Sequence, residues 1–157
     1  HCTLDIAPAN ALQMDSYPGA LGQILTNLIS NALTHAFAGR PDGHIAVTTQ
    51  AGPDSVRISI TDNGNGIDSA SLQRIFDPFF TTRLGKGGSG LGLYIVYNLV
   101  TRTLGGQIDV QSTPGTGTRF TLALPCTAPA DGAHENAMAI PVHDRAPLNF
   151  EDFGPII

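Results

Sequence analysis

One helix-like stretch carries a polar stripe that a buried helix face does not need. Gln23, Asn27, Asn31 and His35 are spaced four residues apart, with Thr34 beside them, so they share one face of a predicted helix. Amide groups donate or accept hydrogen bonds, and they complete an oxygen shell around Mg²⁺ without cancelling phosphate charge. A solvated, asparagine-rich face is the alternative, and the stripe alone favours neither reading.

A second cluster follows a predicted strand. It reads Asp62-Asn63-Gly64-Asn65-Gly66, an acid followed by glycines at alternate positions. Such a sequence is typical of a tight turn. It also suits an acid that accepts a hydrogen bond from an amino group, with Gly64 and Gly66 letting the backbone approach a flat ligand.

The third cluster is a glycine-rich loop, residues 85–93, that runs directly into a predicted helix. Backbone N–H groups in such a loop can cradle phosphates. The loop lacks both the P-loop pattern and the dinucleotide-binding pattern. It holds Lys86, the only lysine of the chain, and Arg83 lies three residues earlier. Beside an anion cradle, Lys86 is interpreted as a γ-phosphate contact.

An apolar segment, residues 76–83, precedes this loop. It contains Phe76, Phe79 and Phe80 in a region without helix or strand periodicity. Phe76 is expected to plug the core at the base of the loop. The hypothesis for Phe79 and Phe80 is that they anchor a mobile lid over a ligand.

Periodicity predicts the elements that position these clusters. Helices are expected over 17–37, 68–75 and 91–104, with Ser16 as the first N-cap. Strands are expected over 3–6, 11–15, 44–50, 55–61, 107–112 and 118–124, the first two on weak patterns. This order predicts an α+β fold: a two-layer α/β sandwich, with a mixed sheet of about five strands and about three helices on one face.

Composition excludes several classes of protein. The 157 residues carry a net charge of −5 with the basic residues scattered, so we expect no nucleic-acid partner and no direct membrane contact. Cys2 and Cys126 form neither a disulfide framework nor a metal cluster, which predicts free thiols and a cytoplasmic domain. We expect a catalytic domain over 1–125, a linker or docking tail over 126–157, and further protein before His1.

The ordered motifs resemble the catalytic ATP-binding domain of sensor histidine kinases, which has the Bergerat fold. The matching motifs are Asn27-Leu28-x-x-Asn31-Ala32, Asp62-x-Gly64-x-Gly66, the Phe-x-Pro-Phe-Phe segment and Gly88-x-Gly90-Leu91-Gly92-Leu93. The resemblance covers about residues 3–124. It implies ATP and Mg²⁺ as cofactors, with residues 76–90 forming a lid over the nucleotide.

The resemblance also implies roles for single residues. Asn31 is expected to coordinate Mg²⁺, Asp62 to bind the adenine amino group, and Thr118 to support Asp62 through water. The expected nucleotide-binding residues are Asn27, Asn31, His35, Asp62, Gly64, Gly66, Ile67, Phe79, Thr82, Gly88, Ser89, Gly90, Leu91, Gly92, Leu93 and Thr118. The expected catalytic residues are Asn27, Arg83 and Lys86.

Two positions bear on the reaction. Many relatives have a basic residue where this chain has Thr34, so Arg83 or Lys86 is expected to compensate, while His35 is a candidate to stack on adenine. Hydrolases of the superfamily carry a general-base glutamate four residues before the metal-binding asparagine. Here that position is Asn27, and an amide cannot take a proton from water. The motifs therefore favour a protein-histidine kinase.

None of the five histidines lies in a recognisable phosphoacceptor context; His134-Glu135 comes nearest. We therefore expect the acceptor on a dimerisation and phosphoacceptor domain of the same protein, upstream of His1, and a response regulator receiver domain as the downstream partner. The fragment alone is expected to bind ATP·Mg²⁺ and phosphorylate nothing. The alternatives are a degenerate nucleotide-binding module and an anti-sigma-type serine kinase of the same fold.

Overall fold

The computed structural model describes residues 2–9, 12–82 and 89–130. Its elements, in chain order, are β1 (Cys2–Ala7), α1 (Pro18–Asn31), η1 (Ala32–Ala36), β2 (Gly43–Ala51), β3 (Ser55–Asp62), α2 (Ser69–Leu72), α3 (Gly92–Asn98), η2 (Leu99–Thr103), β4 (Gln107–Thr113) and β5 (Gly117–Pro125). The elements η1 and η2 are single π-helical segments that continue α1 and α3.

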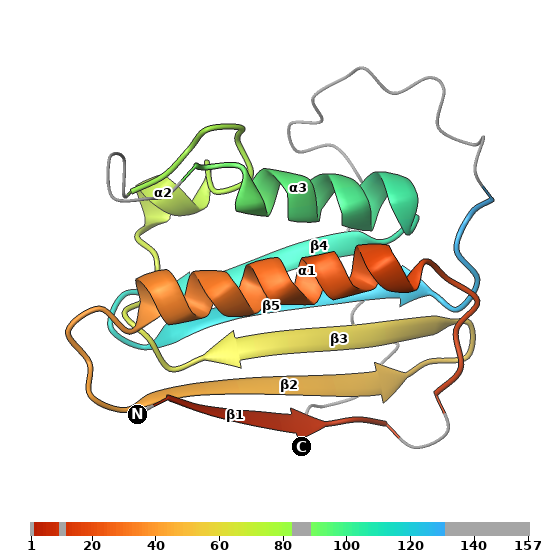
Figure 1. Ribbon diagram of the computed structural model, residues 1–157, viewed down its shortest axis with the longest axis horizontal. Helices are drawn as coiled ribbons and strands as arrows, with labels where there is room; N and C mark the ends of the chain where they lie inside the picture. The colour runs from red at the N-terminus through yellow and green to blue at the C-terminus, as the bar shows by residue number, and fades with distance from the viewer. Residues whose placement is uncertain (1, 10–11, 83–88, 131–157) are drawn as a thin grey trace.

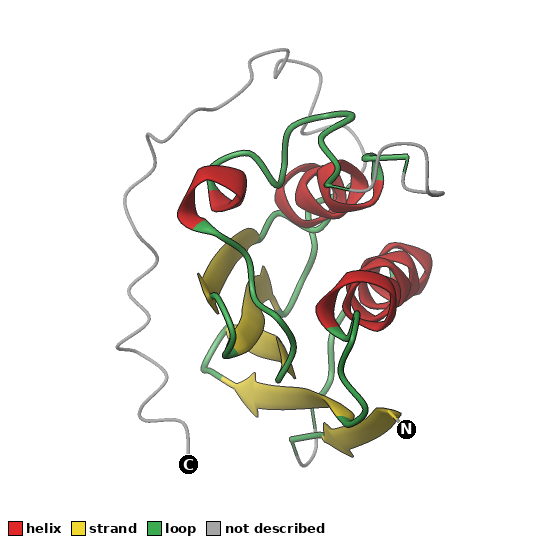
Figure 2. Cartoon of the chain, turned by 90° about the vertical axis from the view of Figure 1, so that its left-hand side faces the viewer, coloured by secondary structure: helices red, strands yellow, loops and turns green. Residues whose placement is uncertain are grey.

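The strands form one five-stranded sheet in the order β1-β2-β3-β5-β4. β1 runs parallel to β2, and the other neighbours are antiparallel, so the sheet is mixed. The helices lie together on one side of this sheet (Figure 1; Figure 2). The predicted α+β sandwich is therefore confirmed.

The core fills the space between the sheet and the helix layer. Ile24 and Leu28 recur four residues apart in α1, as do Val96 and Val100 from α3 into η2, and all four are buried. Alternate residues of the strands face them. The strand residues of this core are Ile45, Val47, Val56, Ile58, Ile60, Phe120, Leu122 and Leu124.

Most expected elements appear within two residues of their predicted ends, and three expectations were wrong. Residues 12–15 form no strand; only Asp15 pairs, in an isolated parallel bridge with Thr127. The cap of α1 is Tyr17, because the helix begins at Pro18 and its Leu21 N–H bonds to the Tyr17 carbonyl. The helix expected over 68–75 shortens to α2, which leaves residues 73–76 in turns.

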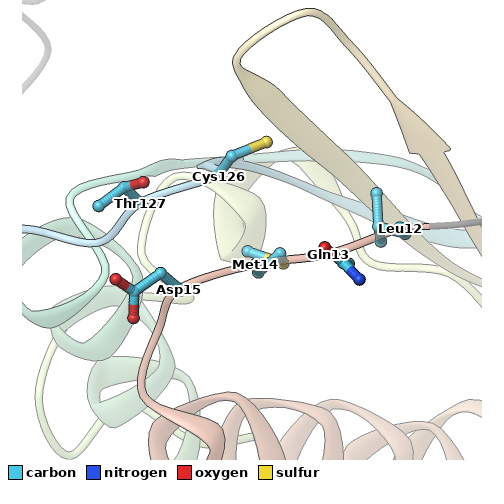
Figure 3. Close-up of a pocket in the computed structure, with 6 residues that line it drawn as sticks. All are labelled: Leu12, Gln13, Met14, Asp15, Cys126 and Thr127. Carbon is cyan, nitrogen blue, oxygen red and sulfur yellow. The ribbon is translucent and has the colours of Figure 1, made fainter.

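The segment before α1 and the residues after β5 lie side by side. Asp15 N–H donates to the Cys126 carbonyl and Ala128 N–H to the Asp15 carbonyl, each at 2.8 Å. The Tyr17 hydroxyl donates to the Pro129 carbonyl at 2.9 Å, so contacts with the domain extend past residue 125. An open pocket of about 610 Å³ lies at this junction (Figure 3). It is lined by Leu12, Gln13, Met14, Asp15, Cys126 and Thr127.

Candidate nucleotide site

A polar row closes one end of the apolar face of the sheet. Asp62 follows Val56, Ile58 and Ile60 at the strand period of two, so its side chain faces the helix layer. Its partner in β5 is Thr118, and the partner of Thr118 in β4 is Ser112. The three polar side chains thus lie in one row across adjacent strands, where the apolar rows end.

The carboxylate of Asp62 is held by backbone groups. Its Oδ1 accepts from Gly64 N–H at 2.8 Å and from Thr118 N–H at 3.3 Å. The side chain of Asp62 is only 8% exposed. Because both bonds fall on Oδ1, the described residues leave Oδ2 for a donor from a ligand.

Burial raises the pKa of Asp62 above its ordinary value, and three weaker influences oppose this effect. They are the two backbone hydrogen bonds, which favour the charged form, and the positive charge of Arg40. A ligand that donates a hydrogen bond to the ionised acid supplies a fourth such influence.

The two motif glycines fit spaces that a larger residue would overfill. A Cβ at Gly64 would lie 2.3 Å from Ala36 Cβ and 2.7 Å from Asp62 Oδ1. Gly66 has φ +69°, and a Cβ there would lie 2.1 Å from the Thr113 carbonyl oxygen. Within the described residues, the close approach that glycine permits is therefore to the end of the first helix and to the β4–β5 turn.

Hydrogen bonds fasten the Asp62–Gly66 segment on several sides. Asn65 N–H donates to the Ala36 carbonyl at 2.8 Å, and Gly115 N–H donates to the Asn65 carbonyl at 2.7 Å. Arg40 donates to the carbonyls of Asn63 and, at 2.8 Å, of Gly115. These bonds join the segment to the first helix and to the β4–β5 turn.

The hydroxyl groups of Ser112 and Thr118 add further contacts next to Asp62. Ser112 Oγ accepts from Ile67 N–H at 2.8 Å and lies 3.0 Å from Thr118 Oγ1. Thr118 thus reaches Asp62 directly through its backbone N–H, while its hydroxyl faces Ser112.

Sequence reasoning missed Arg40 and Ser112. The predicted β4–β5 hairpin could have indicated Ser112, because antiparallel pairing sets it opposite Thr118. No sequence pattern indicated Arg40.

A second group of expected residues lies where α1 meets the start of α3. A Cβ at Gly92 would lie 3.8 Å from Asn31 Oδ1 and Nδ2 and 4.0 Å from Asn27 Oδ1. The Nδ2 of Asn27 is buried and has no hydrogen-bond partner among the described residues. A buried donor without an acceptor costs about 1–3 kcal/mol, so this position fits a ligand oxygen.

The segment between α2 and α3 is partly packed and partly exposed. The Phe76 ring lies 5.3 Å from that of Tyr97, as expected for a core plug, and Phe80 packs under the Arg74 guanidinium at 4.8 Å. Phe79 behaves differently, with 71% exposure and φ +64°. Its backbone occupies the space next to Gly90, where a Cβ would lie 2.5 Å from the Phe79 carbonyl carbon.

The expected site residues thus fall into two groups. The first surrounds the acid: Asp62, Gly64, Gly66, Ile67 and Thr118. The second surrounds the amides: Asn27, Asn31 and Gly92.

The remaining expected residues lie around or beyond these groups. His35 lies in η1, directly before Ala36, which contacts Gly64. Ser89 Oγ accepts from Leu91 N–H at 3.3 Å, and Leu93 packs on the core. Thr82 is exposed, and Arg83, Lys86 and Gly88 lie outside the described residues.

The molecule is a mixed sheet under one helix layer, with a buried acid and two amides among the residues expected to bind a nucleotide. The family model for histidine kinase-, DNA gyrase B- and HSP90-like ATPases matches residues 17–128. The chain belongs to this family, and the expected resemblance is confirmed.

The similar sequences are sensor proteins. The chain is 43% identical over 113 residues to the sensor histidine kinase ZraS of Escherichia coli O157:H7, a match that covers 72% of this chain and 23% of that protein. It is 39% identical to the alginate biosynthesis sensor protein KinB of Pseudomonas aeruginosa over 73% of this chain and 18% of that one. The match therefore spans less than a quarter of either relative.

Solved structures agree with this family. The catalytic domain of histidine kinase ThkA, in a nucleotide-free form, superposes with a TM-score of 0.69 at 29% identity, covering 80% of each chain. The mycobacterial sensor histidine kinase MprB gives 0.66 at 28% identity, covering 79% of this chain and 81% of that one.

No described helix is long and apolar enough to cross a membrane. The described residues contain no group of three or more His, Cys, Asp or Glu side chains placed to hold a metal ion.

Proposed function

We propose that this chain binds ATP with Mg²⁺ and transfers the γ-phosphoryl group to a histidine on a separate dimerisation and phosphoacceptor domain of the same protein. The observation that carries the proposal is Asp62. It is buried at the end of the sheet, its Oδ1 is held by two backbone donors, and its Oδ2 is left for the adenine amino group.

The acid group binds the base. The N6 amino group of adenine donates to Asp62, and a guanine carbonyl at the same place offers no proton, which gives selection of the base. Gly64 and Gly66 let the Asp62–Gly66 segment pack closely on Ala36 and on the β4–β5 turn, which fixes Asp62 for the base. We assign Ile67 and His35 to the border of the base site.

The amide group suits the phosphates and the metal. An amide oxygen is a suitable Mg²⁺ ligand, and Asn31 is the residue that would hold the ion beside Gly92. When bound, Mg²⁺ neutralises charge that develops on the phosphates. The buried Nδ2 of Asn27 donates to a phosphate oxygen, and the residues from Ser89 to Leu93 border the chain of phosphates.

Transfer is favoured over hydrolysis because no carboxylate stands at position 27. Asn27 orients the phosphate and does not activate water. Positioning and charge stabilisation are the main needs of phosphoryl transfer. We assign the additional positive charge to Arg83 and Lys86, and the cover over the nucleotide to residues 76–90 with Phe79, Thr82, Gly88 and Gly90.

The decisive experiment uses the parent protein with its acceptor domain and ATP labelled at the γ-phosphate. The expected product is phosphohistidine, which is stable in base and labile in acid. An inert complete protein would contradict the proposal. Acid-stable phosphoserine on a partner protein would instead favour the serine-kinase alternative.

A non-catalytic nucleotide-binding module is the second candidate, and the uncharged Thr34 favours it, because the resemblance to histidine kinases implies a basic residue at this position. Calorimetric titration with ATP, with and without Mg²⁺, tests whether the chain binds nucleotide at all. Both candidates require binding, and a chain that binds neither ATP nor ATP·Mg²⁺ would serve only as a scaffold. A module that binds ATP without transferring phosphate supports the second candidate.

The same proposal includes a downstream partner and a cellular compartment. The partner is a response regulator receiver domain that accepts the phosphoryl group, and the compartment of this domain is the cytoplasm. The proposed domain spans residues 1–125, and residues 126–157 form a linker or docking tail.

A further inference from the structure

One face of the sheet carries no described helix. Strand register places on it the residues that alternate with the core-facing ones. This helix-free face includes Thr3, Asp5, Ala7, His44, Ala46, Thr48, Gln50, Arg57, Ser59, Thr61, Gln107, Asp109, Gln111, Arg119, Thr121 and Ala123. The described helices all lie on the opposite side of the sheet (Figure 2).

The centre of the helix-free face is nevertheless shielded from water. Arg57 is 5% exposed, Ser59 6%, Ala123 6% and Thr121 8%. All four belong to the adjacent strands β3 and β5. A polar face of an antiparallel sheet is usually wet. Burial at the middle of this face therefore calls for a covering segment.

The chemistry of the face limits what can cover it. Arg57 and Arg119 give its two central strands positive charge, and their contacts include two neutral oxygens, Gln50 Oε1 at 3.5 Å and Thr61 Oγ1 at 3.3 Å. Burial also lowers the pKa of Arg57. A guanidinium shielded from water is best matched by carboxylates. A suitable occupant is acidic and also brings apolar side chains.

We propose that the last residues of the chain, 149–157, dock on the helix-free face. Their sequence, Asn-Phe-Glu-Asp-Phe-Gly-Pro-Ile-Ile, places Glu151 and Asp152 between Phe150 and Phe153. The acids match the two arginines, and the rings supply the apolar cover. The proposal is independent of nucleotide binding.

The chain is long enough for this placement. The described part ends at Ala130, beside Tyr17, whose hydroxyl bonds to the Pro129 carbonyl. The residues from Ala130 to Asn149 span up to about 60 Å when extended. A strand of nine residues such as β5 is about 30 Å long. The tail therefore reaches any point on the helix-free face.

Thiol labelling of the 157-residue chain tests the proposal. Ser59→Cys places a thiol at the buried centre of the helix-free face, Cys126→Ser removes the half-buried native thiol, and exposed Cys2 serves as the reference. Each labelling rate is divided by its rate in denaturant. The thiol introduced by Ser59→Cys is expected to react at least about tenfold more slowly than Cys2.

Adding Phe150→Ser and Phe153→Ser should bring the two rates together. The matched control Met138→Ser changes an apolar residue of the tail outside 149–157 and should leave the protection intact. Equal rates with the native tail would overturn the proposal. So would protection that survives the double change, or protection that is lost on dilution, which indicates a second copy of the chain.

A disulfide cross-link tests docking of residues 149–157 in a second way, which does not depend on the Phe150→Ser and Phe153→Ser variants. A chain with Ser59→Cys, Phe153→Cys, Cys2→Ser and Cys126→Ser is expected to form an intramolecular disulfide under mild oxidation. A second chain that carries Met138→Cys in place of Phe153→Cys is the control. Cross-linking no faster than in this control would contradict docking of residues 149–157.

Discussion

The acid end and the amide end of the candidate site are built differently. Asp62 is buried, and its loop is fastened to the first helix and to the β4–β5 turn. At the amide end, Asn27 Nδ2 has no partner among the described residues, and the nearest atoms to a Cβ at Gly92 lie 3.8 Å away. The acid end is held in place by its own hydrogen bonds, with Asp62 Oδ2 left for a ligand, whereas the amide end has a buried donor without a partner among the described residues.

This difference suggests how binding energy is distributed. A preformed base site loses little conformational freedom on binding, so it gives selectivity at low entropic cost. An open phosphate site gains its contacts only with ligand and metal present. We therefore expect substitutions at the acid end to disturb the fold or the base preference, and substitutions at the amide end to disturb metal-dependent binding.

The largest contrast should come from alanine at one glycine of each end. Gly64→Ala forces a Cβ to within 2.3 Å of Ala36 and should lower the free energy of unfolding by about 3 kcal/mol or more. Gly92→Ala meets only ordinary contacts and should change it by less than about 1 kcal/mol. Urea unfolding measures both. Equal losses of unfolding free energy in the two variants would contradict the claim that the acid end is more tightly packed than the amide end.

Replacement of Asp62 by asparagine should change how the stability of the domain depends on pH. Because burial raises its pKa, this acid contributes most stability when protonated, below its unfolded pKa of about 3.9. That stability is lost as pH rises through the folded pKa. Asp62→Asn should therefore gain stability relative to the wild type with rising pH, then level off.

Asp68→Asn is a control of opposite sign. The pKa of Asp68 is lowered, chiefly by the Ser71 N–H bond at the start of α2, so its stabilisation is lost as pH falls through the folded pKa. Unfolding midpoints across the acid range measure both variants. A loss of stability by Asp62→Asn relative to the wild type as pH rises would contradict the burial argument.

Removal of the Asn31 amide should act through the metal. Asn31→Ala is expected to remove most of the gain in ATP affinity that Mg²⁺ provides, about tenfold or more, and to leave stability nearly unchanged. Gln23→Ala removes an exposed amide from the same helix and should retain the gain. Calorimetry with and without Mg²⁺ measures the difference. If Mg²⁺ raised the ATP affinity of Asn31→Ala as much as that of the wild type, Asn31 would not be the metal ligand.

The smallest effect concerns the exposed aromatic of the segment before α3. Phe79 has φ +64°, where a side chain costs about 1 kcal/mol or more, and its ring packs on little. Phe79→Gly should therefore raise thermal stability slightly, while Phe79→Ala, which keeps the strain, should not. A loss of stability in Phe79→Gly would show that the ring has structural contacts.

The acid end was largely predictable because its features are local or periodic. Alternation along β3 carries Asp62 to the same face as Ile58 and Ile60, and hairpin pairing brings Thr118 opposite it. The bonds from Arg40 required knowledge of how the chain turns after the first helix. The same was true of the Ala36–Gly64 contact, which joins residues far apart in sequence.

Other features had no reliable local signal. The π-helical segments are continuous with α-helices, and the spacing of Asn27, Asn31 and His35 does not reveal them. A left-handed conformation at Phe79 runs against the preference of aromatic residues, so no pattern predicts it. The 12–15 segment has the composition of a strand but pairs only at Asp15, although Leu12 and Met14 pack on the core.

The central claim is that Asp62 reads the adenine base, and base preference tests it most directly. ATP and GTP would be titrated into the wild type and Asp62→Asn by calorimetry at neutral pH. Loss of a hydrogen bond to a charged acceptor corresponds to about ten- to a hundredfold weaker ATP binding, with little change for GTP. Unchanged ATP affinity and unchanged preference in Asp62→Asn, in a variant that remains folded, would contradict the account.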